Sequence, residues 1–139
     1  MNTYVALIIL LLSVTPTVLP AAETNVTGKW TYEKEVGDAD GKKYPHKTAM
    51  NLKQEGDSLT GTVVQTSDAP WMREITGRSI EITDGKVEGN KVSFRIQIVT
   101  SRNQRVSQYD GIVEYGHFTG ILKFRGIGIS ETFDAKRSQ

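Results

Sequence analysis

Hydrophobic and polar residues alternate along most of the chain after Ala22, and no segment there repeats its apolar residues with the period of a helix. The alternating segments are bounded by Gly, Asn and Asp, which favour turns. This pattern predicts an all-β protein built from about eight strands. The strands are expected at residues 28–36, 48–54, 58–66, 78–88, 91–100, 106–115, 118–125 and 131–137.

Side-chain register tests the first expected hairpin. In a hairpin with a two-residue loop, residues that lie directly opposite each other share a face. If Gly56-Asp57 is the loop, Leu52 faces Gly61, and the apolar side chains of both strands fall on one side. The sequence therefore predicts a hairpin with one apolar face and one polar face.

The same test applied to residues 106–125 places the loop at Gly116-His117. Tyr115 is then expected opposite Phe118, and the two strands again share one apolar face. On the expected inner face of both hairpins, small residues lie opposite large ones, which suits the tapered interior of a small barrel. The expected pairs are Leu52 with Gly61, Val113 with Gly120 and Leu122 with Gly111.

The segment between these hairpins carries two turn signals, Asp84-Gly85 and Gly89-Asn90. If the loop is at Gly89-Asn90, Ile80 and Ile82 fall on the opposite face of the strand from Val87, because they differ from it by an odd number of positions. A β-bulge at Asp84-Gly85 supplies the missing residue, and Gly85 is expected to adopt the positive φ that one bulge type requires. The alternative is a wider loop that runs from Asp84 to Gly89.

Sequential antiparallel strands that each have one apolar face must bury that face. Closure into a single up-and-down β-barrel does so and removes both sheet edges. A two-sheet β-sandwich is the runner-up. An eight-stranded barrel is either filled by its own side chains or holds one small ligand, and the sequence leaves both possibilities open.

An eleven-residue apolar run at residues 4–14 precedes the first charged side chain, Glu23. The run is too short for a membrane span, which needs about 20 apolar residues, and fits the core of a signal peptide. We expect residues 1–22 to be a signal peptide and residues 23–139 to form one β-barrel domain. This domain would be exported to the periplasm or the cell exterior, with no stable membrane insertion after cleavage. The alternative is an uncleaved N-terminal anchor.

Composition excludes several kinds of function. The net charge of +1 gives no general attraction to nucleic acid, and the absence of cysteine excludes a disulfide and a thiol nucleophile. The two histidines, His46 and His117, have no metal-ligand spacing, and no Ser–His–Asp order or other catalytic motif is present. We therefore expect a protein that is not an enzyme, with no catalytic residues, no metal, no cofactor and no nucleic-acid partner.

The first expected strand opens with Gly28 and Trp30 in a Gly-x-Trp motif, and Arg137 in the last strand has the parity of the apolar side. This motif at this position resembles the calycin barrels, the lipocalins and avidins. The chain also resembles small exported bacterial β-proteins of unassigned role, which share its segments LTGTV and DGKV-x-GN-x-VSF. The resemblance implies a lipocalin-like barrel in which Trp30 lies across one end under Arg137, as a cation–π pair.

Three tyrosines, Tyr32, Tyr109 and Tyr115, are expected to point inward by parity. Their hydroxyls are suited to orient a ligand, although core tyrosines with satisfied hydroxyls are a common alternative. Trp71 lies in a long loop over residues 67–77, where it either edges a binding mouth or belongs to a plug that covers one barrel end. These four side chains are the candidate ligand-binding residues.

Together these observations favour an exported barrel that binds a small, partly apolar ligand without catalysis. The alternative is a solid barrel that contacts an envelope partner, such as a polysaccharide or a protein, through its surface and the loop that carries Trp71. The sequence assigns neither the identity of a ligand nor the oligomeric state.

Overall fold

The structure is a computed structural model that describes residues 25–138. The expected signal peptide at residues 1–22 lies outside the described residues. Eight strands and one short 3₁₀ helix follow one another in the described part. They are β1 (Gly28–Gly37), β2 (Lys43–Glu55), β3 (Ser58–Ser67), η1 (Pro70–Met72), β4 (Ser79–Glu88), β5 (Lys91–Val99), β6 (Gln104–Glu114), β7 (His117–Phe124) and β8 (Ile129–Arg137).

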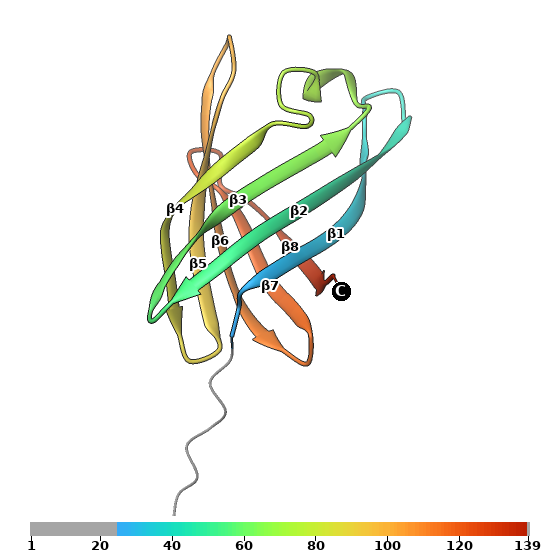
Figure 1. The fold of residues 1–139 in the computed structure, drawn as a ribbon. Helices are drawn as coiled ribbons and strands as arrows, with labels where there is room; N and C mark the ends of the chain where they lie inside the picture. The colour runs from blue at the N-terminus through green and yellow to red at the C-terminus, as the bar shows by residue number, and fades with distance from the viewer. Residues whose placement is uncertain (1–24, 139) are drawn as a thin grey trace, which may run out of the picture.

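Each strand pairs antiparallel with the next one along the chain, and β8 pairs with β1 to close the barrel (Figure 1). The closing ladder is short, with Trp30 opposite Arg137 and Thr31 opposite Lys136. This confirms the up-and-down barrel that the alternation predicts, and the two-sheet sandwich is wrong. Curling the sheet onto itself buries the apolar faces of all strands in one core.

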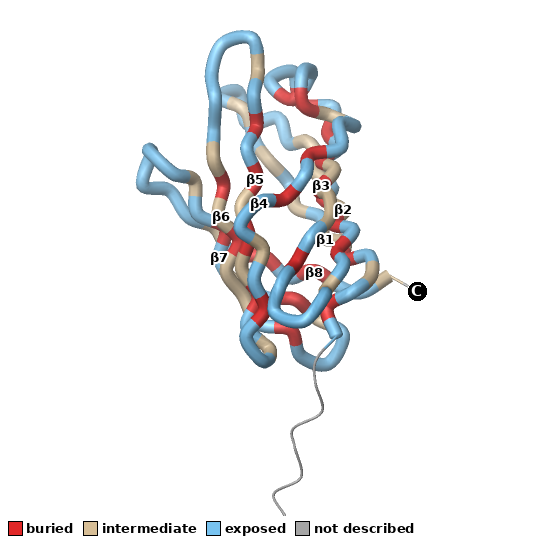
Figure 2. The backbone as a smooth tube through the Cα atoms, turned by 60° about the vertical axis from the view of Figure 1, so that its left-hand side comes forward, coloured by how far each residue is buried: buried red, intermediate tan, exposed pale blue. Residues whose placement is uncertain are grey.

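Alternate residues along the strands are buried, and Figure 2 shows buried and exposed positions alternating along the strands. An aromatic cluster fills the interior near Trp30. Phe118 lies edge-on to Trp30, with ring centres 6.3 Å apart, and its ring centre is 4.9 Å from that of Phe133. Phe94 stacks on Tyr109 at 4.8 Å. This part of the barrel is therefore solid.

The first hairpin has the expected loop and register. The chain turns at Gly56-Asp57 between β2 and β3, and Leu52 lies opposite Gly61. Gly56 has a φ of 60°, and a type II′ turn needs a positive φ at its first central residue. The alternation and the glycine were thus sufficient to place this hairpin.

The next hairpin turns at Gly89-Asn90, and the bulge expected at Asp84-Gly85 is present, since β4 has one residue more than β5 at that point. The positive φ expected at Gly85 is wrong. Asp84 has it instead, with a φ of 52°, a conformation that Asp adopts more readily than most residues. Glycine is needed at position 85 because a Cβ there would lie 2.0 Å from the carbonyl oxygen of Leu59.

The hairpin between β6 and β7 differs from the expected one. Its loop is Tyr115-Gly116 rather than Gly116-His117, so Val113 faces Phe118. Both loop residues have positive φ, 51° and 77°, as a type I′ turn requires. The Tyr115 side chain is 99% exposed, so the expectation that it points inward is wrong. The physical reason is that a loop residue no longer follows the alternation of the strand.

The register of this hairpin places Gly111 opposite Gly120, so the pairs expected with Leu122 and Val113 are also wrong. A Cβ on Gly120 would lie 2.0 Å from the backbone oxygen of Asp110. The two strands approach each other too closely here for any side chain to fit. Because the pairing moves by two residues, the other inward residues of both strands keep their face.

β2 begins at Lys43, earlier than the expected start at Thr48. Its first residues pair with β1, where Pro45 lies opposite Glu35, and pairing with β3 begins only at His46. Pro45 therefore lies on an edge of the sheet, where the missing N–H of proline is tolerated. The early start of β2 was not predicted because a proline within a run of residues argues against a strand.

Candidate ligand-binding site

A cavity of about 200 Å³ lies inside one end of the barrel, bordered by the loop over residues 67–77. We call this end the mouth, and Figure 1 shows the loop that follows β3 at the end of the barrel opposite the β2–β3 and β4–β5 hairpins. Every strand except β4 contributes to the lining. The apolar part of the lining includes Val36, Met72, Ile75, Ile98, Leu122 and Phe124.

The loop over residues 67–77 covers the mouth. Its side chains Met72 and Ile75 are buried. The backbone of the loop is held in place where the N–H of Gly77 donates to the carbonyl oxygen of Gln65 at 2.8 Å. This loop therefore covers part of this end of the barrel and also borders the cavity.

Trp71 lies at the edge of the same cavity and is 49% exposed. Its ring packs edge-on against Tyr44 of β2, with ring centres 5.5 Å apart. The neighbouring residue Met72 points into the barrel instead. One turn of 3₁₀ helix thus places an aromatic ring at the edge of the mouth and an apolar side chain inside it.

Two of the tyrosines selected from the sequence meet below the mouth. Tyr32 of β1 lines the cavity, and its hydroxyl is 3.1 Å from that of the fully buried Tyr109 of β6. Burial raises the pKa of Tyr32 and raises the pKa of Tyr109 well above its ordinary value. Both side chains are therefore neutral at physiological pH and offer hydrogen bonds without charge.

Three further polar side chains line the cavity and are buried: Thr48, Gln65 and Ser107. The hydroxyl oxygen of Thr48 has no partner at hydrogen-bond geometry among the described residues. An unpaired buried polar group costs about 1–3 kcal/mol, so such groups are uncommon. These residues were not predicted as site residues from the sequence. The signal that could have identified them is that each is a polar residue at an inward position of its strand.

Besides tyrosine, the titratable side chains of the lining are Lys34, His46, Arg105 and Glu131. Lys34 and Glu131 form an ion pair. Burial, with a smaller contribution from the charge of Lys34, lowers the pKa of His46, so its ring is neutral at pH 7. The Arg105 guanidinium lies 5.9 Å from the centre of the Phe124 ring and has no ion-pair partner within residues 25–138. Arg105 therefore carries the unmatched charge of the lining.

Tyr115 is not part of this site, because it lies in the β6–β7 loop at the other end of the barrel. Trp30 and Arg137 lie at that end too. The guanidinium carbon of Arg137 is 4.4 Å from the centre of the Trp30 ring, which is the cation–π pair expected from the sequence. That end of the barrel is closed by this pair and by the aromatic cluster beneath it.

A second hollow, of about 540 Å³, continues from the cavity between the loop over residues 67–77 and the β5–β6 hairpin. Both hollows are lined by Trp71, Met72, Ile75, Ile98 and Arg105. Glu74 ties the loop to the hairpin, since its carboxylate accepts hydrogen bonds from the N–H of Ser101 at 2.7 Å and from the Ser101 hydroxyl at 2.5 Å. The mouth thus opens sideways into a wider groove.

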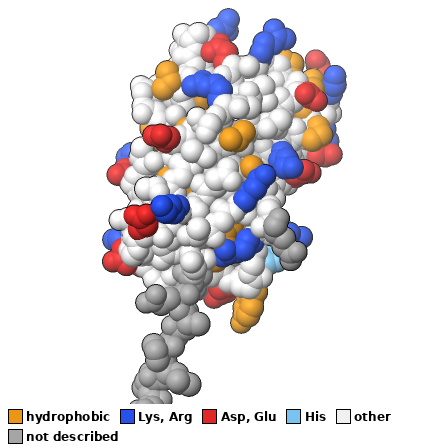
Figure 3. Space-filling model, in the orientation of Figure 1, with side chains coloured by type: hydrophobic (Ala, Val, Ile, Leu, Met, Phe, Trp, Pro, Cys, Tyr) orange, Lys and Arg blue, Asp and Glu red, His pale blue; other side chains and the backbone are white. Residues whose placement is uncertain are grey.

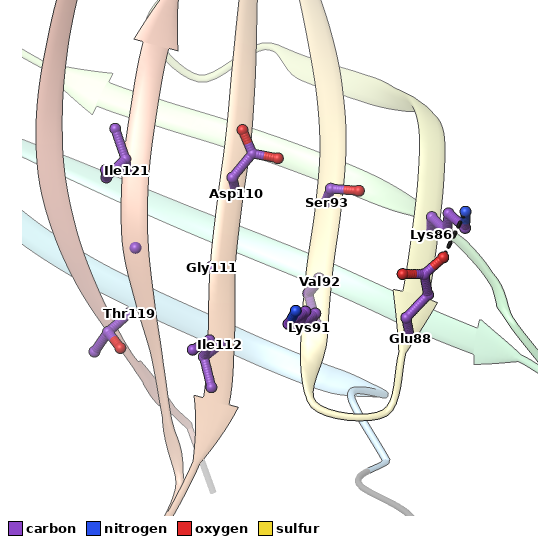
Figure 4. Close-up of a pocket in the computed structure, with 11 residues that line it drawn as sticks. Lys86, Glu88, Lys91, Val92, Ser93, Asp110, Gly111, Ile112, Thr119 and Ile121 are labelled. Carbon is purple, nitrogen blue, oxygen red and sulfur yellow. Dashed lines mark ion pairs between the residues drawn. The ribbon is translucent and has the colours of Figure 1, made fainter.

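A third hollow, of about 670 Å³, is an open groove on the outer surface of strands β4 to β7 (Figure 4). Ile112 of β6 and Ile121 of β7 lie in it. An ion pair between Lys86 and Glu88, with 2.6 Å between nitrogen and oxygen, lies at its β4 side. The sheet itself separates this groove from the interior of the barrel.

Comparison of the chain with protein-family models, with curated proteins and with solved structures found no match. Within residues 25–138, no helix is long and apolar enough to cross a membrane. In the same part of the chain, no three His, Asp or Glu side chains are grouped as metal ligands. The evidence that this cavity is a binding site is therefore the geometry and chemistry of its lining.

Proposed function

We propose that this chain is a lipocalin-like barrel that binds a small, partly apolar ligand in the mouth cavity without converting it. The observation that carries this proposal is a cavity of about 200 Å³ that combines apolar walls with the unpaired, fully buried hydroxyl of Thr48. The rest of the interior is packed with aromatic and aliphatic side chains. Polar groups buried at one end lower the stability of a barrel, and sites that break packing rules in this way are commonly functional.

The volume of the cavity limits the size of the ligand. A space of about 200 Å³ is far larger than the roughly 10–15 Å³ that a cavity needs to hold one water molecule. A molecule with a single ring or a short chain fits this space. The groove between residues 67–77 and the β5–β6 hairpin leaves room for a substituent.

The lining favours binding over catalysis. Its carboxylate, Glu131, is paired with Lys34. Its tyrosine, Tyr32, has a pKa above the ordinary value because it is buried. Catalytic bases and nucleophiles instead need a pKa near the working pH and a reacting partner within hydrogen-bond reach.

Native mass spectrometry of the protein purified from its source tests this proposal. We expect a small molecule that stays bound to the folded protein and is released on unfolding. Ser107→Leu fills the cavity and should abolish retention. Val106→Leu is the matched control, because Val106 is the adjacent residue on the opposite face of the same strand, and it should retain the ligand. Protein that carries no small molecule and binds none from a panel of small aromatic and aliphatic compounds contradicts the proposal.

We also propose that residues 1–22 direct export to the periplasm or the cell exterior and are then removed. The apolar run at residues 4–14 supports this proposal. N-terminal sequencing of protein from its source is the test. A chain that begins near Glu23 is expected, and a chain that begins at Met1 contradicts export with cleavage.

A second candidate function is contact with an envelope partner through the outer groove. Ile112 and Ile121, on the neighbouring strands β6 and β7, are 41% and 44% exposed there, and exposed apolar patches are typical of interaction surfaces. On the face shown in Figure 3, by contrast, basic and acidic side chains are interspersed. Capture of a polysaccharide or protein from envelope material by the wild type, and its loss in Ile112→Asp, would favour this function. Equal capture by Trp71→Ala and the wild type would separate it from the mouth.

A further inference from the structure

We propose that the ligand of the mouth cavity is a small hydroxy acid, whose hydroxyl group binds beside Thr48 at the deep end and whose carboxylate binds Arg105 at the mouth. This inference rests on the proposed function and names the chemical class of its ligand. Two independent features carry it: an unpaired polar group inside the cavity and an unmatched charge at its opening.

Thr48 marks the deep end of the cavity. It lies on β2 opposite Tyr32 and Gln65 of the two neighbouring strands and is fully buried. The Tyr32 hydroxyl already bonds to that of Tyr109, at 3.1 Å. Burial has the larger effect on the Tyr32 pKa and raises it, and the Thr48 hydroxyl is close enough to Tyr32 to lower that pKa, but the Thr48 oxygen has no partner of hydrogen-bond geometry in the described chain. A threonine hydroxyl has one donor and two acceptor positions. A ligand hydroxyl, which both donates and accepts, matches this group.

Arg105 supplies the charge at the mouth. It has the inward parity of Tyr109 on β6 and lies four residues nearer the mouth, which is about 13 Å of strand at about 3.3 Å per residue. Lys34 is neutralised by Glu131, and the other lining base, His46, has a lowered pKa because it is buried. A guanidinium binds a carboxylate through two parallel hydrogen bonds, which favours a carboxylic acid over other small anions.

The wall between these two ends is apolar. Ile98 of β5 and Leu122 and Phe124 of β7 line it, and Met72 closes it from the loop. The Phe124 ring lies 5.9 Å from the guanidinium of Arg105, so a ligand ring or short chain that packs on Phe124 has its carboxylate within reach of the arginine. A fully apolar molecule would leave Thr48 and Arg105 unmatched.

Three probe compounds of similar size test the assignment: 4-hydroxybenzoate, benzoate and 4-hydroxybenzamide. Benzoate lacks the hydroxyl group, and the amide lacks the negative charge. Their binding to the purified protein is measured by NMR titration of backbone amides, with Gln65 and Ile98 as reporters of the cavity. We expect 4-hydroxybenzoate to bind at least about ten-fold more tightly than either analogue, because each analogue leaves one buried or charged protein group without its partner.

Two variants connect each preference to its side chain. Thr48→Val keeps the shape but removes the hydroxyl, and should reduce the preference over benzoate to less than about two-fold while benzoate affinity is unchanged. Arg105→Gln should remove the preference over 4-hydroxybenzamide in the same way. Arg102→Gln is the matched control, because Arg102 lines the adjoining groove but not the cavity, and it should keep both preferences.

The possible outcomes separate this inference from the proposed function. Equal binding of the three compounds overturns the hydroxy-acid assignment and leaves small-ligand binding in place. Preferences that persist in Thr48→Val and Arg105→Gln overturn the roles of these two side chains. Binding of none of the compounds overturns the assignment, and the proposed function then stands only if protein from its source retains some other small molecule.

Discussion

The guanidinium of Arg137 lies 4.4 Å from the centre of the Trp30 ring and donates hydrogen bonds to the carbonyl oxygens of Thr27, at 2.7 Å, and Asn25, at 2.5 Å. The last strand thereby holds the segment that leads into the first one. The Trp30 indole N–H donates to the carbonyl oxygen of Val26 at 2.9 Å. The ladder between β1 and β8 has only two residue pairs. These side-chain contacts therefore strengthen the barrel at its shortest strand pairing.

Replacing Arg137 by Met should lower the free energy of unfolding by about 2 kcal/mol, because it removes charge-assisted hydrogen bonds and the cation–π contact. Arg137→Lys should recover part of the loss, since lysine keeps the charge but not the planar fork. Urea unfolding measures both changes. Lys136→Met, at an exposed neighbouring position, should have little effect, and an equal loss there would show that charge alone is responsible.

Replacing Tyr115 by Asn should raise the free energy of unfolding by about 0.5–1 kcal/mol. Tyr115 has a φ of 51° and a fully exposed ring, and Asn-Gly is the preferred pair in a type I′ turn. Tyr115→Ala is the control, because alanine does not relieve the positive φ. Thermal unfolding compares the three proteins, and an unchanged or lower stability of the Asn variant would contradict the turn assignment.

Replacing Gly120 by Ala should lower the free energy of unfolding by more than about 2 kcal/mol, because its Cβ would lie 2.0 Å from the backbone oxygen of Asp110. Thr119→Ala, at the exposed adjacent position, should cost far less. Urea unfolding of both variants, with circular dichroism to verify the fold, measures the difference. Similar stabilities of the two variants would mean that β6 and β7 do not approach so closely.

Replacing Thr48 by Val in the ligand-free protein should raise the free energy of unfolding by about 1 kcal/mol, since the change removes an unpaired buried hydroxyl. Ser67→Ala is the matched control. The Ser67 hydroxyl accepts a hydrogen bond from the N–H of Ala69 at 3.2 Å, so its loss should destabilise the protein. The comparison uses chemical unfolding, and a destabilised Thr48→Val would show that the Thr48 hydroxyl is satisfied.

The lowered pKa of His46, caused by burial first and by the charge of Lys34 second, predicts a pH dependence of stability. Between the folded-state pKa and the unfolded value of 6.5, the unfolded chain binds more protons than the folded one, so stability rises with pH. The contribution is complete above the unfolded pKa and is lost as the pH falls through the folded-state pKa.

The wild type should therefore lose more stability than His46→Gln when the pH is lowered from about 7.5 to about 5. Urea unfolding at several pH values measures both proteins. Because glutamine does not titrate, it provides the baseline for the other groups of the chain. Parallel curves for the two proteins would contradict a shifted pKa at this position.

Local rules were sufficient for most of the fold. The side-chain period of a strand is two, and turn residues act within a few positions, so the hairpin at Gly56-Asp57 and the bulge near Asp84 could be predicted. The loop at Tyr115-Gly116 could not, because moving a two-residue loop by one residue shifts the pairing by two and keeps every face of both strands.

The candidate site was predicted only in part. Tyr32 and Trp71 line the cavity as expected from parity and loop position, whereas Thr48 and Arg105 went unnoticed because each is unremarkable within its own strand. They become neighbours of one cavity only after strands distant in the sequence close into a barrel.

Within the strands, the sequence by itself determined which side chains point inward, since alternation is a property of each strand alone; it failed at Tyr115, which lies in a loop. The tertiary structure decided which end of the barrel is filled and which is hollow. That outcome depends on which inward side chains meet across the interior. Whether their combined volume fills the space at one level of the barrel is set only once the strands are closed into a barrel.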